Sequence, residues 1–195
     1  MRPSRLIHEK IALRDGRTAV LRPIDPSDAE RLIDLHNHLS FESQYFRFFG
    51  PKPQLTPAEA EYLANVDFHR RFAIVAEIDG DEIVGVGRFD VNEPGVAEAA
   101  VVVRDDYQHV GLGTALLQRM REVARGAGLK TFTAEVLAEN NRMLDLLSAN
   151  GLETAEADQG VVKVIAPIEN QPVLFRGLKV AAEVAGAILP KRLSG

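Results

Sequence analysis

The sequence contains no cysteine among its 195 residues. Disulfide bonds, thiolate metal sites and a mechanism through an acyl-cysteine intermediate are therefore excluded. Long hydrophobic runs are also missing, because no stretch approaches the roughly 20 apolar residues that a membrane-spanning helix needs. The first ten residues, MRPSRLIHEK, lack the apolar core of a secretory signal. These absences predict a cytoplasmic protein that makes no use of a membrane.

The chain also lacks an excess of basic residues. Its formal net charge is −5, which argues against nucleic acid as the main partner. The charge is uneven, since residues 1–22 carry +4, residues 171–195 carry +3, and the remainder carries −12. We expect an acidic body, which would favour a cationic substrate.

The pattern of apolar and turn-forming residues predicts one main domain of mixed α/β (α+β) class. Expected strands cover residues 18–25, 71–78, 82–91, 95–103, 130–138 and 160–167, and expected helices cover 26–39, 56–66, 111–127 and 139–151. Asp25 and Thr56, each followed by proline, are predicted helix N-caps. Asp79–Asp81, with the sequence DGD, predicts a hairpin turn. The aromatic- and proline-rich residues 40–55 predict a loop or a broken helix.

The two ends of the chain are predicted to lie outside the main domain. Residues 1–17 form an expected N-terminal arm, 18–168 the domain, and 169–195 a C-terminal extension. Apolar residues in the extension recur at helical spacing from Leu178 to Leu189, which predicts an amphipathic helix. We expect this helix to dock on the domain. Dimerisation through it and binding to a membrane surface are the alternatives, the second disfavoured because the polar side of the helix carries few basic residues. The chain is predicted to be a monomer or a homodimer.

Residues 108–113, QHVGLG, connect an expected strand to an expected helix. Free backbone N–H groups and the positive end of the helix dipole make such a connection an anion site. The dinucleotide fingerprint is excluded because position 116 is Leu, and a nucleoside-triphosphate loop is excluded because Thr114 and Ala115 follow Gly113. A coenzyme A pyrophosphate and a turn without a ligand remain.

The same residues carry a family resemblance. Gln108-His109-Val110-Gly111-Leu112-Gly113 resembles the Q/R-x-x-G-x-G/A motif of the GNAT acetyltransferase superfamily. Four blocks in order are similar to Pat-type bacterial protein lysine acetyltransferase domains: LRPIDPSDAERL, LSFESQYFRFF, AEAAVVVRDDYQHVGLGTALL and EVLAENNRMLDLLSANGL. The resemblance covers 18–167. It implies a GNAT-like mixed, mostly antiparallel central sheet flanked by helices, with a splayed central strand.

The resemblance also implies where acetyl-CoA, as acyl donor, would bind. Backbone amides of the turn would hold the pyrophosphate, a strand edge would hold the pantetheine arm, and an Asn would flank the coenzyme. The implied coenzyme-binding residues are Val101, Val102, Val103, Gln108, His109, Val110, Gly111, Leu112, Gly113, Thr114, Asn140 and Asn141.

Glu98 is the predicted catalytic base. A lysine ammonium has a pKa of ~10.4 and must lose a proton before it can attack a thioester. Glu98 lies in the apolar segment VAEAAVVV, where burial would raise its pKa. Superfamily members often have a general-base Glu in this strand, whereas an Arg partner across the sheet is the structural alternative.

The proton donor to the leaving thiolate is not identified. The position of the usual tyrosine is Leu147, and the aromatic residue after the helix-ending glycine is replaced by Leu152. Tyr107 is more typical of a packing residue. No metal ligand is predicted, because His36 and His38 are two apart on a helix and point to different sides.

The acceptor side is less defined. The aromatic residues between Phe41 and Phe49 are expected in the core, and Asp67 and Glu42 are weak acceptor-side candidates by resemblance. The predicted function is transfer of an acetyl group to a primary amine by direct transfer in a ternary complex. A protein lysine is the expected acceptor, with an acyl-CoA synthetase as a candidate partner. The alternatives are a small-amine acetyltransferase and a catalytically weak coenzyme-binding sensor or interaction module.

Overall fold

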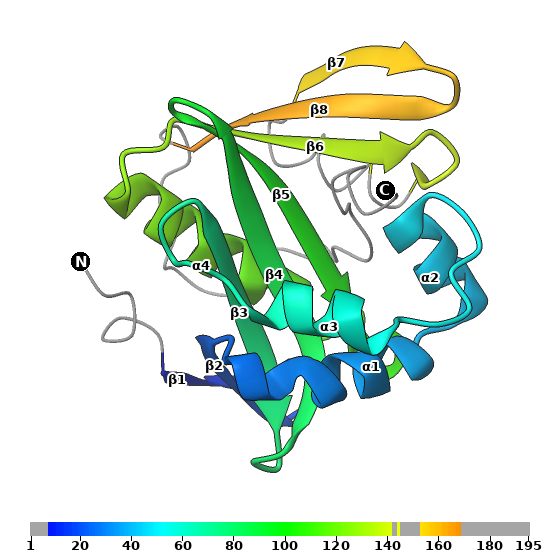
Figure 1. Ribbon diagram of the computed structural model, residues 1–195, viewed down its shortest axis with the longest axis vertical. Coiled ribbons are helices and arrows are strands. Elements are labelled where there is room, and N and C mark those ends of the chain that lie inside the picture. Colours follow the sequence, from blue (N-terminus) through cyan, green and yellow to red (C-terminus); the bar gives the residue numbers. More distant parts are fainter. Residues whose placement is uncertain (1–7, 142–143, 145–152, 169–195) are drawn as a thin grey trace.

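The computed structural model describes residues 8–141, 144 and 153–168. Their main feature is an eight-stranded sheet of order β1-β2-β3-β4-β5-β6-β8-β7 (Figure 1). The strands are β1 (Glu9–Ala12), β2 (Thr18–Pro23), β3 (Arg71–Ile78), β4 (Glu82–Glu93), β5 (Val96–Val103), β6 (Thr131–Leu137), β7 (Glu153–Asp158) and β8 (Val161–Pro167). Only β5 and β6 pair in parallel. The predicted class, a mixed and mostly antiparallel sheet flanked by helices, is confirmed.

Helices cover both faces of the sheet. They are α1 (Ala29–Asn37), α2 (Phe41–Phe48), α3 (Pro57–Ala64) and α4 (Leu112–Gly126). The core around α4 includes Leu112, Leu116 and Met120 packed on β3, β4 and β5. A second core joins α1 and α3 to the opposite face through Leu32, Leu35 and Leu63. The sheet is thus buried on two sides, as its apolar strands require.

Glycine on β4 sets how closely α4 approaches the sheet. A Cβ atom at Gly87 would lie 2.5 Å from Sδ of Met120, and one at Gly85 would lie 3.1 Å from Cδ1 of Leu116. Both distances are shorter than side-chain contacts normally allow. The helix that follows the glycine turn can therefore lie directly on the strand.

The local signals at helix starts and turns are confirmed. Asp25 accepts a hydrogen bond from the Ser27 amide, although it caps a short 3-10 turn, Pro26–Asp28, that precedes α1. Thr56 caps α3 in a reciprocal capping box with Glu59. Asp79 and Gly80 both adopt positive φ, 51° and 79°, as a two-residue hairpin turn requires.

Three elements were not predicted. β1 lies in the expected N-terminal arm and pairs with β2, and β7 pairs with β8. Residues 40–55 contain the two-turn helix α2, capped by Ser40 and ended by Phe49 in the left-handed region at φ 59°. Part of the expected helix at 139–151, with Leu147, lies outside the described residues, as do Leu152 and the expected C-terminal helix.

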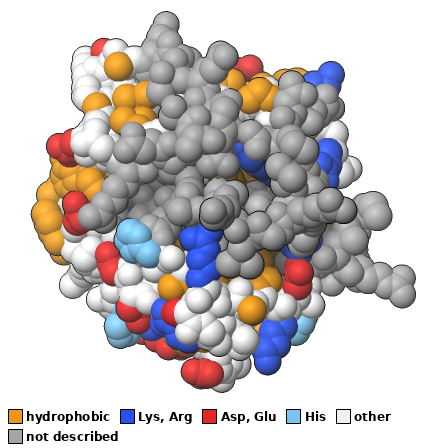
Figure 2. Space-filling view, turned by 180° about the vertical axis from the view of Figure 1, so that it is seen from behind, with side chains coloured by type: hydrophobic (Ala, Val, Ile, Leu, Met, Phe, Trp, Pro, Cys, Tyr) orange, Lys and Arg blue, Asp and Glu red, His pale blue; other side chains and the backbone are white. Residues whose placement is uncertain are grey.

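The surface opposite the view of Figure 1 carries charges of both signs. Figure 2 shows basic and acidic side chains interspersed over the lower half of that face. Several charged side chains of the protein form ion pairs, among them Arg31 with Asp81 at 2.6 Å. The acidic excess of the sequence is therefore partly neutralised by neighbouring basic side chains.

Candidate active site

The pairing of β5 with β6 ends early and leaves a wedge in the sheet. Three pairs hold the two strands together: Val96 with Thr131, Ala97 with Phe132, and Glu98 with Thr133. β5 continues to Val103 and β6 to Leu137, while β5 stays paired with β4 to its end. Among the described residues, the edge of β5 beyond Glu98 therefore has no strand partner on the β6 side. This is the splayed central strand that was predicted, and it is visible between β5 and β6 in Figure 1.

The glycine turn, residues 108–113, lies at the open end of this wedge, because it follows the end of β5 after a short 3-10 turn, Asp105–Tyr107. Gly111 is the N-cap of α4 at φ 90°, it has no side-chain cap, and the first turn of α4 contains no acidic residue. His109 also has positive φ, at 64°. The curled backbone and the positive end of the helix dipole suit a phosphate group. The residues present therefore fit a coenzyme pyrophosphate.

Gln108 has an internal role that the sequence motif did not reveal. Its Nε2 donates to the carbonyl oxygen of Val103 at 3.1 Å and to Oγ of Ser43 at 3.3 Å. Its backbone N–H donates to the carbonyl oxygen of Asp105. Gln108 thus ties the turn to the end of β5 and to α2.

Asp105 fixes α2 beside the turn. Its carboxylate accepts hydrogen bonds from the Ser40 amide at 2.8 Å and from the hydroxyls of Ser40 and Ser43 at 2.7 Å each. Sequence reasoning missed this contact because the two segments are more than 60 residues apart. The available signal was a pair of serines, Ser40 and Ser43, three residues apart at a helix start.

The hairpin between β1 and β2 supports the turn from its other side. The Arg14 amide donates to the carbonyl oxygen of Val110 at 3.1 Å. The Arg17 guanidinium stacks on the Tyr107 ring, with Cζ 3.7 Å from the ring centroid, and donates to the carbonyl oxygen of Asp106. Tyr107 is buried and serves as the packing residue that was expected.

Glu98 lies at the closed end of the wedge, as the last residue of β5 paired with β6. Its carboxylate is half-buried, and Asn92 donates a hydrogen bond to it at 3.0 Å. Burial raises the pKa of Glu98, and the negative charges of Glu135 and Asp90 raise it further, whereas Asn92 and Arg47 oppose the increase. Within the described residues no arginine forms an ion pair with Glu98. The carboxylate is consequently more basic than an ordinary glutamate.

Asn140 and Asn141 lie just beyond the end of β6, on the other side of the wedge. Asn140 is buried, and its carbonyl oxygen accepts the Leu144 amide in the first turn of the following helix. Asn141 is exposed. The wedge therefore has the glycine turn at the end of one strand and an Asn pair at the end of the other.

The two weak acceptor-side candidates differ in their surroundings. Oδ1 of Asp67 accepts three backbone N–H groups, from His69, Arg70 and Arg71, at 2.8 Å each. Burial would raise the pKa of Asp67, but these bonds hold it below its ordinary value, so the carboxylate serves to order its own loop. Glu42 is exposed in the first turn of α2.

The aromatic residues of α2 are not the core cluster that was expected. Phe41 is 69% exposed, and the helix buries Ser43 and Arg47 instead. His36, the next-to-last residue of α1, is buried, and its Nε2–H donates a hydrogen bond to the Lys52 carbonyl oxygen, 2.8 Å away. The described part of the chain has no cluster of His, Asp and Glu that could hold a metal, and no helix there is long and apolar enough to span a membrane.

Comparison with known proteins decides the family. The profile of the acetyltransferase (GNAT) family matches residues 35–152, which include the wedge, Glu98 and the glycine turn. The chain belongs to the GNAT acetyltransferase family. The predicted family and the predicted enzyme class, an N-acetyltransferase, are thereby confirmed.

Individual GNAT relatives support this. An acetyltransferase of Pseudomonas aeruginosa is 35% identical over 144 residues, which are 72% of this chain and 77% of the relative. Acetyltransferase Pat of Mycolicibacterium smegmatis is 30% identical over 168 residues, 83% of this chain, and the match spans half of that relative's length. The GNAT domain of Pat from S. lividans has a TM-score of 0.77 at 35% identity, covering 82% of this chain and 96% of that domain.

Proposed function

We propose that the protein transfers an acetyl group from acetyl-CoA to the primary amine of a protein lysine, by direct transfer in a ternary complex. The observation that carries this proposal is the position of Glu98, a carboxylate of raised pKa at the closed end of the β5–β6 wedge. The similarity to Pat proteins supports a lysine acceptor and makes an acyl-CoA synthetase the first partner to test.

Each part of the proposed site has a separate role. When bound, acetyl-CoA supplies an activated thioester carbonyl and a thiolate leaving group. The edge of β5 at Val101–Val103 holds the coenzyme arm, and the backbone of His109–Thr114 binds its phosphates together with the dipole of α4. Asn140 and Asn141 flank it from the β6 side. Leu112 and Leu116 anchor α4 so that its first turn stays in place.

Glu98 performs the proton transfer that the amine needs. An acceptor ammonium gives its proton to the Glu98 carboxylate, directly or through one water, and the free amine then forms the new C–N bond as the C–S bond breaks. The raised pKa of Glu98 makes the carboxylate a better base at neutral pH. Desolvation of the wedge by α1, α2 and α3 strengthens this effect.

The test is release of free thiol from acetyl-CoA in the presence of lysine-containing proteins, including an acyl-CoA synthetase, and of small amines. The chain has no cysteine and therefore adds no thiol of its own to the assay, and each acceptor protein without acetyl-CoA serves as the blank. Acceptor-dependent release supports the proposal, and mass spectrometry locates the modified amine. Tight acetyl-CoA binding with no release from any acceptor would instead identify a coenzyme-binding sensor.

The domain boundaries and location are part of the same proposal. Residues 18–168 form the catalytic domain, 1–17 an arm whose strand β1 completes the sheet edge, and 169–195 an extension, in a cytoplasmic protein. Removing 169–195 and measuring thiol release and the mass in solution tests whether the extension affects catalysis or dimerisation.

A further inference from the structure

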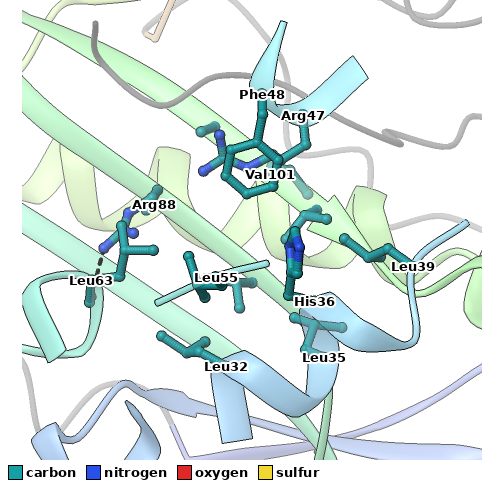
Figure 3. Close-up of a pocket in the computed structure, with 13 residues that line it drawn as sticks. Leu32, Leu35, His36, Leu39, Arg47, Phe48, Leu55, Leu63, Arg88 and Val101 are labelled. Carbon is teal, nitrogen blue, oxygen red and sulfur yellow. Dashed lines mark hydrogen bonds between the residues drawn. The ribbon is translucent and has the colours of Figure 1, made fainter. Parts of the chain in front are cut away.

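A small cavity lies on the sheet face opposite α4, between β4, β5 and the helices α1, α2 and α3. Its volume is about 40 Å³, and most of its wall is leucine and valine (Figure 3). A water molecule needs about 10–15 Å³ by the same measure, so the cavity has room for a group of about three heavy atoms. Three polar side chains line it: His36, Arg47 and Arg88.

Arg47 enters this cavity from α2, and no carboxylate of the described residues forms an ion pair with it. Its side chain is 5% exposed, and Nη1 has no hydrogen-bond partner among the described residues. The guanidinium packs near the Phe48 ring, with Cζ 5.3 Å from the centroid. Burial lowers the pKa of Arg47 to about 9, and the nearby charge of Arg88 adds to this. Burial of the positive charge of Arg47 is therefore energetically unfavourable.

Arg88 adds a second buried cation from β4. Its side chain is 4% exposed, Nη2 donates to the carbonyl oxygen of Leu63 at 2.8 Å, and Nε has no partner in the described part of the chain. Burial lowers the pKa of Arg88 to about 10. Neither arginine forms a salt bridge with a described residue, although buried cations are normally paired.

His36 supplies an acceptor to the same cavity. The Lys52 carbonyl oxygen can only accept a hydrogen bond, so the Nε2 atom of His36, 2.8 Å away, carries the proton. Burial lowers the pKa of His36, which favours the neutral ring. Nδ1 is then an acceptor, and it has no partner among the described residues. The lining of the cavity thus combines two buried arginine side chains with one neutral histidine ring.

The cavity adjoins the proposed base. Arg88 is paired with Ala100 and Asp90 with Glu98 in the β4–β5 ladder, so Arg88 and Glu98 lie on one face as diagonal neighbours. Electrostatic attraction between Glu98 and Arg47 places the second cation in the same neighbourhood. A substituent a few bonds from an amine at Glu98 would reach the two arginines.

We propose that this cavity is a carboxylate subsite, and that the acceptor amine carries a carboxylate close to its amino group. The inference rests on the proposed function, because Glu98 places the amine. The guanidinium groups of Arg47 and Arg88 donate to the carboxylate, and the neutral ring of His36 lies beside them in the wall of the cavity. The carboxylate can belong to a free amino acid or to an acidic side chain beside the acceptor lysine.

A binding experiment tests the subsite without turnover. The full chain, labelled with ¹⁵N-arginine, is titrated with propionate while the Nε–Hε resonances are followed, and Arg88→Lys identifies the Arg88 signal. We expect a saturable shift of the Arg88 signal with propionate and none with the neutral isostere propionamide. No saturable shift in the wild-type chain, or an equal shift with propionamide, overturns the proposal.

Two variants sharpen this result. Arg47→Gln removes one cation and should weaken propionate binding about ten- to a hundredfold, the usual worth of a hydrogen bond to a charged group. Arg125→Gln, on the exposed end of α4, is the matched control and should change nothing. Equal binding by the Arg47→Gln variant would contradict the assignment, and the wild-type titration decides the matter if that variant does not fold.

Turnover then distinguishes the two sources of the carboxylate. Free amino acids are compared with their carboxamides, and lysine peptides with a neighbouring Glu are compared with the same peptides carrying Gln. We expect kcat/KM to favour the carboxylate member of one pair about tenfold or more, and Arg47→Gln to abolish the preference. Turnover without any preference refutes the subsite alone. Propionate binding without turnover of any acceptor refutes the proposed function alone.

Discussion

Nδ2 of Asn92, on β4, donates a hydrogen bond to Oε2 of Glu98, on β5, at 3.0 Å. This bond stabilises the ionised carboxylate, while burial and the charges of Glu135 and Asp90 stabilise the protonated form. Burial and the two neighbouring carboxylates raise the pKa of Glu98, whereas Asn92 and the charge of Arg47 lower it, and the increase prevails.

The first prediction concerns this balance. Asn92→Ala removes a donor to the ionised form, so the pKa of Glu98 should rise further. Because Glu98 works as a base when deprotonated, the acid limb of kcat/KM against pH should move to higher pH. Asn92→Asp, which adds a negative charge, should move it further still, whereas Asn37→Ala on α1 should leave it in place. If the acid limb of the pH profile stays in place in both Asn92 variants, the Asn92–Glu98 hydrogen bond does not influence the pKa of the base.

Glu98→Gln keeps the shape of the side chain and removes its basicity. We expect kcat for acetyl transfer to fall by about 10²–10⁴-fold at neutral pH, the usual contribution of a general base. The affinity for acetyl-CoA, measured by calorimetry, should change little, because the proposed binding contacts lie on the backbone. Turnover close to the wild-type rate would remove Glu98 from the mechanism.

Gly111→Ala introduces a Cβ at a residue with φ of 90°, beside the Arg14 side chain. A left-handed conformation costs an ordinary L-residue about 1–2 kcal/mol, so the variant should be less stable by that order. Its KM for acetyl-CoA should rise more than its kcat falls, since the strain lies in the phosphate turn. Gly126→Ala, in open space at the end of α4, is the control and should be neutral or slightly stabilising in urea unfolding.

Gly87→Ala tests the close packing of α4 on β4. The new methyl group would lie 2.5 Å from Sδ of Met120, and overpacking of this kind costs about 1–3 kcal/mol of unfolding free energy. Met120→Ala alone should also destabilise, by leaving a cavity. The double variant should be more stable than the sum of the two losses predicts, because each change relieves the other. Strict additivity in urea unfolding would mean that the two residues do not meet.

Asp28 links stability to pH. Its carboxylate is 1% exposed and accepts two hydrogen bonds from Arg22, at 2.7 and 2.8 Å. Burial would raise the pKa of Asp28, but the Arg22 bonds and the Asp25 amide outweigh this and hold it below its ordinary value. The folded pKa therefore lies below the unfolded value of about 3.9, so the stabilisation is present above that pH and is lost as the pH falls through the folded pKa.

Asp28→Asn should accordingly cost about 3 kcal/mol of unfolding free energy at pH 7, since it removes a buried carboxylate and leaves the partly buried Arg22 with one anionic partner fewer. The difference from wild type should shrink as the pH falls below 4, because the wild-type carboxyl then protonates as well. Asp81→Asn, an 84% exposed member of the same charge network, should cost a small fraction of that at any pH. Urea unfolding at several pH values measures both.

Local chemistry made much of the fold predictable. Asp25, Thr56 and the Asp79–Asp81 turn act through hydrogen bonds and dihedral angles within a few residues, so their sequence signals suffice. α2 was not predicted because its buried positions are Ser43 and Arg47, while Phe41 faces solvent. The hydrophobic pattern of α2 would therefore predict a different buried face from the one observed. The observed orientation depends on Asp105 and on tertiary contacts.

The candidate site divides in the same way. Glu98 and the turn from Gln108 to Gly113 carry recognisable signals within one stretch of sequence. The anchoring of Gln108 to Ser43, and the meeting of Arg47 with Arg88 in one cavity, join segments about 40 to 65 residues apart. Such pairs arise from the order of strands and helices in space, which a single sequence does not specify.

The wedge between β5 and β6 also has a mechanical consequence. In the described part of the sheet, three residue pairs form the whole seam between the five strands β1–β5 and the trio β6, β8 and β7. A ligand that hydrogen-bonds to both edges of the wedge would act as a cross-link across that seam. At a hundred times its dissociation constant such a ligand stabilises the fold by about 2.7 kcal/mol. The acyl donor would thus stabilise the sheet as well as react. Release of the product coenzyme would weaken the contact between the two parts of the sheet until the next donor binds.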